Sequence, residues 1–206
     1  MKVLNFETGP IYVNTYLCYD EETLLGFVVD PGGVSKELDK AINDNNVTVN
    51  YIVLTHGHGD HIGGVNHLKS LFSDIKVVAS SKELEMLLDE KINCSLEMFR
   101  EPIIINPEIL VNDGDTLDIG NLTLKFISTP GHTKGGMCIY VNNVLFSGDT
   151  LFRRSIGRSD YYGGDFDTLI RMIKNKLFIL PDETIVYPGH NGFTSIGEEK
   201  KGNPFV

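Results

Sequence analysis

Three of the six histidines lie within six residues, directly after the apolar run from Tyr51 to Leu54. The segment reads Thr55-His56-Gly57-His58-Gly59-Asp60-His61, and imidazole and carboxylate groups are ligands that zinc and other divalent metals accept. The two glycines let the backbone turn tightly, so that His56 and His58 face one point while Asp60 and His61 face a neighbouring point. Four ligand-type side chains around two glycines have no evident packing purpose. The segment therefore predicts a metal-binding loop at the end of a strand.

Three further ligand-type residues follow strand-like runs later in the chain, and each comes directly after a glycine. They are His132 in Pro130-Gly131-His132, Asp149 in Ser147-Gly148-Asp149 and His190 in Pro188-Gly189-His190. A glycine permits the sharp exit from a strand that turns the next side chain toward a shared cleft. Singly, Gly-His and Gly-Asp are common turn dipeptides, but their threefold repetition indicates one site. His67 stands alone on the helix predicted after the loop, and we interpret it as a structural or surface residue.

Short runs of β-branched and aromatic residues, bounded by turn residues, supply the strands that must position these side chains. The predicted strands are 15–19, 26–29, 49–54, 76–79, 122–128, 137–141, 144–147 and 184–187. Asn142-Asn143 between two of them predicts an antiparallel two-residue hairpin. The class is mixed α/β, with sheets packed together and helices outside.

Helices are predicted in three places. One covers 35–43, a second follows a capping box formed by Ser80 and Glu83, and a third begins at Asp165. The third carries its apolar residues on one face, namely Phe166, Leu169, Ile170, Ile173 and Leu177. Residues 89–107 have the weakest pattern and predict a surface excursion or part of a lid.

Composition excludes several classes of function. The 206 residues include 18 Lys and Arg against 28 Asp and Glu, a formal charge of −10, so we expect no nucleic-acid partner. The longest apolar runs are far shorter than the ~20 residues needed to cross a bilayer, and the N-terminal segment lacks the apolar run of a secretory signal. No cysteines form a Cys-x-x-Cys pair, and Cys18 and Cys138 read as buried apolar residues. We expect one domain over 1–206, in a reducing cytoplasm and without membrane association.

The series His-x-His-x-Asp-His, followed by separated His132, Asp149 and His190, resembles the metallo-β-lactamase-fold hydrolases. Three segments are more specifically similar to the short, glyoxalase II-like hydroxyacylglutathione hydrolases. They are Gly148-Asp149-Thr150-Leu151-Phe152, Gly157-Arg158, and Ile196-Gly197-Glu198-Glu199-Lys200 through Asn203-Pro204-Phe205. The resemblance covers nearly the whole chain. It implies a four-layer αββα sandwich of mixed, mostly antiparallel sheets with outer helices and the metals at one edge.

The resemblance also implies a role for each ligand-type residue. The first metal site would comprise His56, His58 and His132, the second Asp60, His61 and His190, and Asp149 would bridge the two. The cofactors would be two divalent metal ions, with zinc as the default and iron or manganese as alternatives that the same ligands suit. Asp30, at the end of strand 26–29, matches an acidic residue that supports the metal-binding loop. An Asp-Pro-Gly turn explains Asp30 equally well.

The implied activity is hydrolysis of a small-molecule thioester such as S-lactoylglutathione or a related acyl-thiol. Two metals ~3.5–4 Å apart can share a water and lower its pKa toward ~7, which supplies a bridging hydroxide at neutral pH. Asp60 would orient this hydroxide and accept its proton as the catalytic residue. Arg158 matches a basic residue that holds the glutathione moiety, and a guanidinium suits carboxylate binding.

Two features depart from the long glyoxalase II pattern. Only 16 residues follow His190, so we expect no C-terminal helical substrate domain. Asp160 stands where the long forms have a tyrosine, although Tyr161 and Tyr162 lie close by. Glutathione specificity is therefore open. A lactonase, a phosphodiesterase or a β-lactamase-like enzyme on the same scaffold are alternatives, as are a mono-iron persulfide dioxygenase and a metal-binding module without turnover.

Overall fold

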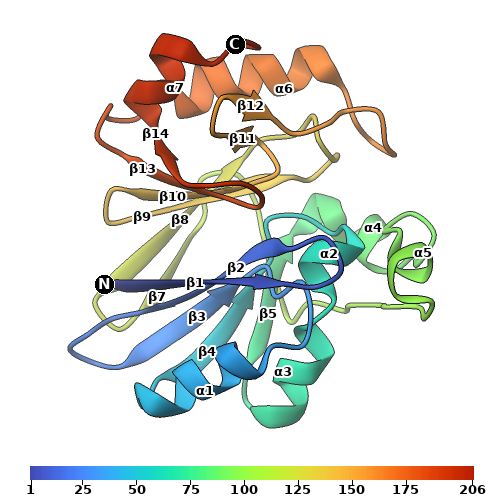
Figure 1. Ribbon diagram of the computed structural model, residues 1–206, viewed down its shortest axis with the longest axis vertical. Helices are drawn as coiled ribbons and strands as arrows, with labels where there is room; N and C mark the ends of the chain where they lie inside the picture. The colour runs from blue at the N-terminus through green and yellow to red at the C-terminus, as the bar shows by residue number, and fades with distance from the viewer.

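Two six-stranded β-sheets pack face to face, and helices cover their outer faces (Figure 1). The computed structural model describes all 206 residues. Helices α1 (Lys36–Asp44) and α3 (Val65–Leu71) lie against the first sheet, while α6 (Phe166–Met172) and α7 (Ile196–Gly202) lie against the second (Figure 1). The order helix, sheet, sheet, helix confirms the predicted four-layer sandwich.

The strands of the first sheet lie in chain order from edge to edge. They are β1 (Lys2–Thr8), β2 (Val13–Tyr19), β3 (Leu25–Val29), β4 (Thr48–Val53), β5 (Lys76–Ser80) and β6 (Ile109–Val111). The second sheet has the order β14-β13-β10-β9-β8-β7. Its strands are β7 (Thr116–Ile119), β8 (Leu122–Ser128), β9 (Met137–Val141), β10 (Val144–Gly148), β13 (Ile185–Pro188) and β14 (Thr194–Ser195). A small hairpin of β11 (Leu151–Phe152) and β12 (Ser155–Ile156) follows β10.

Both sheets are mixed, as predicted. Parallel pairing joins β3, β4, β5 and β6 in the first sheet and β10 with β13 in the second, and the other pairs are antiparallel. Strand β9 lies antiparallel between β8 and β10, and β10 is parallel to β13. Strands β8, β10 and β13 therefore run in one direction, and their carboxyl ends meet at the same edge.

The central strands are apolar on both faces because each sheet is covered on both sides. In β2, Tyr16 and Cys18 belong to the core between the sheets, while Leu17 and Tyr19 pack in the core beneath α1 and α3. A third core, beneath α6 and α7, contains Cys138. Cys18 and Cys138 are thus buried apolar residues, as predicted.

All eight predicted strands are present, with ends within two residues of the expected ones. Asn142 and Asn143 both have positive φ and join the antiparallel strands β9 and β10, which confirms the predicted hairpin. Strands β1, β6, β7, β11, β12 and β14 are additional. Most of these are only two to four residues long, and β1 and β7 lie at sheet edges where polar residues interrupt the apolar pattern.

The predicted helices need two corrections. Asp165 caps α6 as expected by accepting a hydrogen bond from Thr168 N at 2.7 Å, but Phe166 is half exposed and lies outside the buried face. The predicted capping box between Ser80 and Glu83 was wrong. The Ser80 hydroxyl accepts a hydrogen bond from Lys82 N, and the Glu83 side chain is hydrogen-bonded to the loop of Thr133 and Gly135 instead of to Ser80. Glu83 ends a 3-10 turn that leads into α4 (Leu84–Leu87).

Residues 89–107 form a packed excursion at the surface. They include the short helix α5 (Ser95–Phe99), which contacts α2 (Gly59–Ile62) of the predicted metal-binding loop. Asn93 and Ser95 are fully buried, and Asn93 O accepts a hydrogen bond from Gly59 N at 2.6 Å. The segment therefore supports the loop. No helix of the chain is long and apolar enough to span a membrane.

Phe146 of β10 is the center of the core between the sheets. The centroid of its ring lies 5.3 Å from the ring centroid of Tyr16, 6.2 Å from that of Phe27 and 5.7 Å from that of Tyr187. We predict that Phe146→Ala lowers the free energy of unfolding by about 3–5 kcal/mol, because it removes a fully buried ring and leaves a cavity. Urea unfolding of the metal-loaded protein measures this loss. Ile179→Ala, at a side chain that is 75% exposed, is the control, and equal midpoints for the two variants would contradict the prediction.

Candidate metal centre

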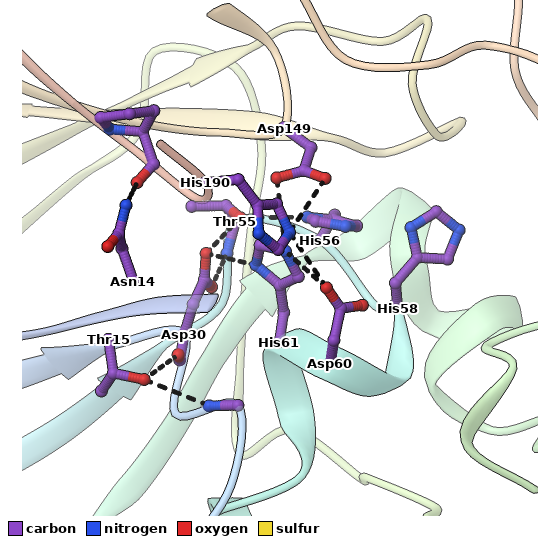
Figure 2. Close-up of polar contacts among 12 residues, drawn as sticks. Asn14, Thr15, Asp30, Thr55, His56, His58, Asp60, His61, Asp149 and His190 are labelled. Atoms are coloured by element: carbon purple, nitrogen blue, oxygen red, sulfur yellow. Dashed lines mark hydrogen bonds and ion pairs between the residues drawn. The ribbon is translucent and has the colours of Figure 1, made fainter. Parts of the chain in front are cut away.

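The predicted ligands follow four strand ends and meet at one edge of the sandwich, and Figure 2 labels all of them except His132. After β4, His56 and His58 lie in the loop that leads into α2, and Asp60 and His61 lie within α2 itself. The remaining three are His132 after β8, Asp149 after β10 and His190 after β13. Since these three strands run in the same direction, their carboxyl ends deliver the side chains to one place. The structure thus brings together all seven residues.

His56, His58 and His132 form a first group of three buried imidazoles. His132 Nε2 lies 3.2 Å from His56 Nε2 and 3.0 Å from His58 Nδ1. Three ring nitrogens that face one another at such distances are suited to a single tetrahedral metal ion with one open position.

Asp60, His61 and His190 form a second group beside the first. Asp60 Oδ2 lies 3.2 Å from His190 Nε2 and 3.4 Å from His61 Nε2. Asp149 lies between the groups: its Oδ1 is 3.3 Å from His61 Nε2 in the second group, and its Oδ2 is 3.6 Å from His132 Nε2 in the first. One carboxylate oxygen of Asp149 thus faces each group, as a ligand that bridges two metal ions requires.

The donors of these groups fit divalent metal ions. His61 Nε2 and Asp149 Oδ1 are buried and have no hydrogen-bond partner in the protein. An unsatisfied buried polar atom costs about 1–3 kcal/mol, and a metal ion between these atoms would satisfy both. The mixture of imidazole nitrogen and carboxylate oxygen suits zinc, iron or manganese.

Asp30, which follows β3, supports the ligands from behind (Figure 2). It accepts hydrogen bonds from Thr55 N at 2.8 Å, from Thr55 Oγ1 at 2.6 Å and from His61 Nδ1 at 2.9 Å. Because the Thr55 hydroxyl donates to Asp30, its oxygen accepts from His56 Nδ1, 3.1 Å away. The contacts with Thr55 and His61 give Asp30 the supporting role that its position at the strand end suggested, in addition to its place in the turn.

These contacts decide which nitrogen of each ring is free. His56 and His61 donate from Nδ1, so Nε2 is the nitrogen of each ring that faces the metal groups. His132 does the same, since its Nδ1 lies 2.6 Å from the carbonyl oxygen of Arg158. The role of that carbonyl could not be predicted, because a backbone oxygen has no signature in the sequence.

Glu83 is a further supporting residue that the sequence interpretation missed. Its buried carboxylate accepts hydrogen bonds from Gly57 N, Gly135 N and Thr133 Oγ1. It therefore ties the loop of His56 and His58 to the loop that carries His132. The sequence signal at Glu83 was its place three residues after Ser80, which equally suits a helix cap.

The glycines next to the ligands act in two different ways. Gly148 has a φ of +48°, a conformation that other residues rarely adopt, and a Cβ there would collide with the Thr55 side chain. Gly189 has no positive φ, but a Cβ on it would collide with Asp149 Oδ1 and lie 2.7 Å from His61 Cε1. Gly57 and Gly59 also lack positive φ, so close packing rather than the predicted tight bend explains them. A Cβ on Gly59 would lie 2.9 Å from Ser95 Cα.

Burial and neighbouring charges set the protonation of the site. Burial lowers the pKa of His56, and His61 and His132 lower it further. Burial and His132 lower the pKa of His58 to about 4. Burial raises the pKa of Asp149, but His61 and His132 outweigh this effect and bring it below its usual range. Neutral imidazoles and an ionised carboxylate are the forms that bind metal.

A cleft of about 420 Å³ opens above the two groups. Its floor is formed by candidate ligands, and its walls are Ile11, Met98, Phe152, Ile156, Arg158 and Tyr161. The aliphatic and aromatic wall residues come from three stretches of the chain, around Ile11, around Met98 and between Phe152 and Tyr161, so no single motif contains them all. Met98 lies on α5, so part of the 89–107 segment contributes to the cleft.

The three arginines after Asp149 have different surroundings. Arg158, the predicted substrate-binding residue, lines the cleft, and its guanidinium is held by the carboxylate of Asp160. Arg154 is structural, because its Nη1 donates to Gly202 O and its backbone N to Glu199. Arg153 is exposed and does not line the cleft.

The Metallo-beta-lactamase superfamily model matches residues 8–190 of this chain, a range that contains every candidate ligand. The chain belongs to this superfamily. A relative from Haemophilus influenzae, hydroxyacylglutathione hydrolase GloC, is 34% identical over 98% of this chain and 98% of its own length.

Two solved structures are similar over almost the entire chain. BLEG-1 B3 metallo-beta-lactamase superposes with a TM-score of 0.92 at 38% identity and covers 99% of both chains. TTHA1623 in a di-iron-bound form superposes with a TM-score of 0.86 at 31% identity and covers 99% of this chain and 100% of that chain. These findings place the chain among the metallo-hydrolases.

Removal of Asp149 tests the proposed bridge. We predict that Asp149→Ala loses about one to two equivalents of bound metal per chain, together with most of the hydrolytic activity. Elemental analysis of the purified protein measures the metal content, and circular dichroism establishes that the variant is folded. Asp167→Asn, an exposed carboxylate on α6, is the control and should retain its metal. Unchanged metal content in Asp149→Ala would refute the assignment of a bridging ligand.

Metal uptake should release a proton from His61. Burial lowers the pKa of His61, but the carboxylates of Asp60, Asp149 and Asp30 raise it well above its usual range. The metal-free protein therefore holds a proton on His61 at neutral pH, and a metal ion must displace it. We predict release of about one proton from this group and an affinity that rises with pH up to the pKa of His61. Titration calorimetry in buffers of different ionisation enthalpy measures the release, and identical heats in all buffers would contradict it.

Proposed function

We propose that the protein hydrolyses an acyl thioester, such as S-lactoylglutathione or a related acyl-thiol, with two divalent metal ions. The observation that carries the proposal is the lack, apart from the candidate ligands, of any carboxyl or imidazole group that could act as a general acid in the cleft. The rest of the lining consists of apolar side chains, Arg158 and Tyr161, and Tyr161, whose hydroxyl accepts a hydrogen bond from Arg158 Nη1 at 3.1 Å, is its sole O–H group. A leaving thiolate needs little protonation, whereas the amine released from an amide requires a proton.

The proposed ligands are His56, His58 and His132 for the first metal and Asp60, His61 and His190 for the second, with Asp149 between them. Metals bound there would polarise the thioester carbonyl and supply hydroxide at neutral pH. Zinc is the default, and iron is an alternative suggested by the similarity to TTHA1623 in its di-iron-bound form.

Asp60 is the proposed catalytic residue. It lines the cleft, and its Oδ2 faces His61 and His190. This contact leaves Oδ1 to orient the attacking water and to accept its proton. In the reaction, the water oxygen forms a bond to the carbonyl carbon, the carbon–sulfur bond breaks, and the proton ends on the departing sulfur. The products are a carboxylic acid and a thiol.

The similarity to Haemophilus influenzae hydroxyacylglutathione hydrolase GloC supports a thioester substrate. The similarity to BLEG-1 B3 metallo-beta-lactamase favours a second candidate, hydrolysis of a β-lactam amide. The lack of a separate proton donor for an amine makes the thioester the first choice. The partner that we propose is accordingly a small molecule and neither a nucleic acid nor a membrane, consistent with a net charge of −10.

A substrate panel decides between these classes. The protein is loaded with zinc or with iron, its metal content is measured, and thioesters, lactones, β-lactams and phosphodiesters are compared. We expect the highest kcat/KM with thioesters and loss of turnover on metal removal. Asp60→Asn should lower kcat. Its metal content is measured in the same samples, so that loss of the catalytic group is separated from loss of metal. If thioesters are inert while another class turns over, the proposed substrate class is wrong.

A further inference from the structure

The cleft offers a single basic side chain to an anionic substrate. Arg158 is the sole lysine or arginine among its lining residues. The protein as a whole carries a charge of −10, so no general attraction brings a carboxylate toward the site. Away from the metal groups on the floor, the attraction of the cleft for a substrate carboxylate therefore depends on the state of the Arg158 guanidinium.

That guanidinium is occupied by the protein itself. Arg158 Nε donates to Asp160 Oδ1 and Nη2 to Asp160 Oδ2, each at 2.7 Å. This is the paired geometry in which arginine binds a carboxylate. The Arg158 guanidinium also lies 3.9 Å above the centre of the Tyr161 ring, and Nη1 donates to the Tyr161 hydroxyl. Asp160 thus takes the place that a substrate carboxylate would take.

A second basic side chain close to a candidate ligand, that of Lys134, is also paired with an acidic residue of the same chain. Lys134, two residues after His132, pairs with Glu85 at 3.0 Å and lies 4.4 Å above the centre of the Tyr162 ring. Tyr162 in turn donates to Glu85 at 2.7 Å. Arg158 and Lys134 therefore each have an acidic partner and an aromatic ring of the same chain.

We propose that Asp160 is a specificity-determining residue that disfavours thioesters with a carboxylate at the Arg158 end of the cleft. The inference rests on the proposed thioesterase function. The preferred substrates are acyl-thiols whose thiol half is uncharged where it reaches Arg158. Ile11, Met98, Phe152 and Ile156 supply apolar walls for such a chain. Asp160 therefore lowers the preference for glutathione thioesters, which carry two carboxylates, relative to uncharged acyl-thiols with the same acyl group.

The size of the effect follows from the exposure of the pair. The side chains of Arg158 and Asp160 are 54% and 66% exposed, and ion pairs in such positions contribute little and are screened by salt. A substrate carboxylate can therefore displace Asp160, but it gains less than it would from a free guanidinium. Asp160 consequently changes substrate preference and does not close the cleft.

The experiment compares S-lactoylglutathione with the lactoyl thioester of N-acetylcysteamine, which has no charge. In Asp160→Asn, the kcat/KM ratio of the charged to the uncharged thioester should rise about two- to fivefold, through the KM of the charged substrate. The gain should shrink at high salt, and Arg158→Ala in the Asp160→Asn background should abolish it. Asp44→Asn, which removes a carboxylate from an exposed pair with Lys40 on α1, is the matched control and should leave the ratio unchanged.

Two outcomes would overturn the inference alone: an unchanged ratio in Asp160→Asn, or the same rise in Asp44→Asn, which would assign the effect to net charge. An equal change in kcat for both thioesters would likewise assign Asp160 a structural role. If the native protein cleaves neither thioester, the proposed function itself is wrong and the inference fails with it.

Discussion

The carboxylate of Asp30 connects the sheet to the metal-binding loop, and the geometry of both candidate metal groups depends on it. The parallel pairing of β3 with β4 sets Val29 opposite Val53, which brings Asp30 beside Thr55. In that position the Asp30 carboxylate accepts hydrogen bonds from Thr55 N, the Thr55 hydroxyl and His61 Nδ1. One buried carboxylate thereby orients His61 directly and His56 through Thr55. His56 belongs to the first group and His61 to the second, so Asp30 fixes the orientation of one imidazole in each group.

Convergence of so many donors is unfavourable by itself. Ring nitrogens lie 3.0–3.2 Å apart, and His61 Nε2 and Asp149 Oδ1 have no protein partner. The surrounding fold holds them there: Glu83 joins two ligand loops, and Gly189 allows its strand end to approach Asp149 and His61 closely. A metal ion would remove the repulsion between the ring nitrogens and satisfy the atoms that lack a partner. The stability of the packed cores holds the ligands in place for the metal, so metal binding and folding are coupled.

Three features of the cleft support the proposed thioester substrate. Its walls are mostly apolar, its single arginine is paired with Asp160, and no separate acid stands ready to protonate a leaving group. Thioester sulfur departs without strong protonation, and an apolar acyl-thiol requires no cation. The family relation establishes a metallo-hydrolase on this scaffold, while the walls and rim of this chain narrow what it can accept.

The sequence by itself determined eight of the fourteen strands, the sandwich class and the identity of the seven ligand-type residues. It did so because strand patterns are local and because three histidines in six residues, and a glycine before each later ligand, are visible without coordinates. Only the tertiary structure decided how the rings are oriented, that Glu83 joins two loops rather than capping a helix, and that Asp160 occupies Arg158. These features depend on contacts between segments far apart in the chain, or on side-chain directions and backbone carbonyls, which leave no periodic pattern in the sequence.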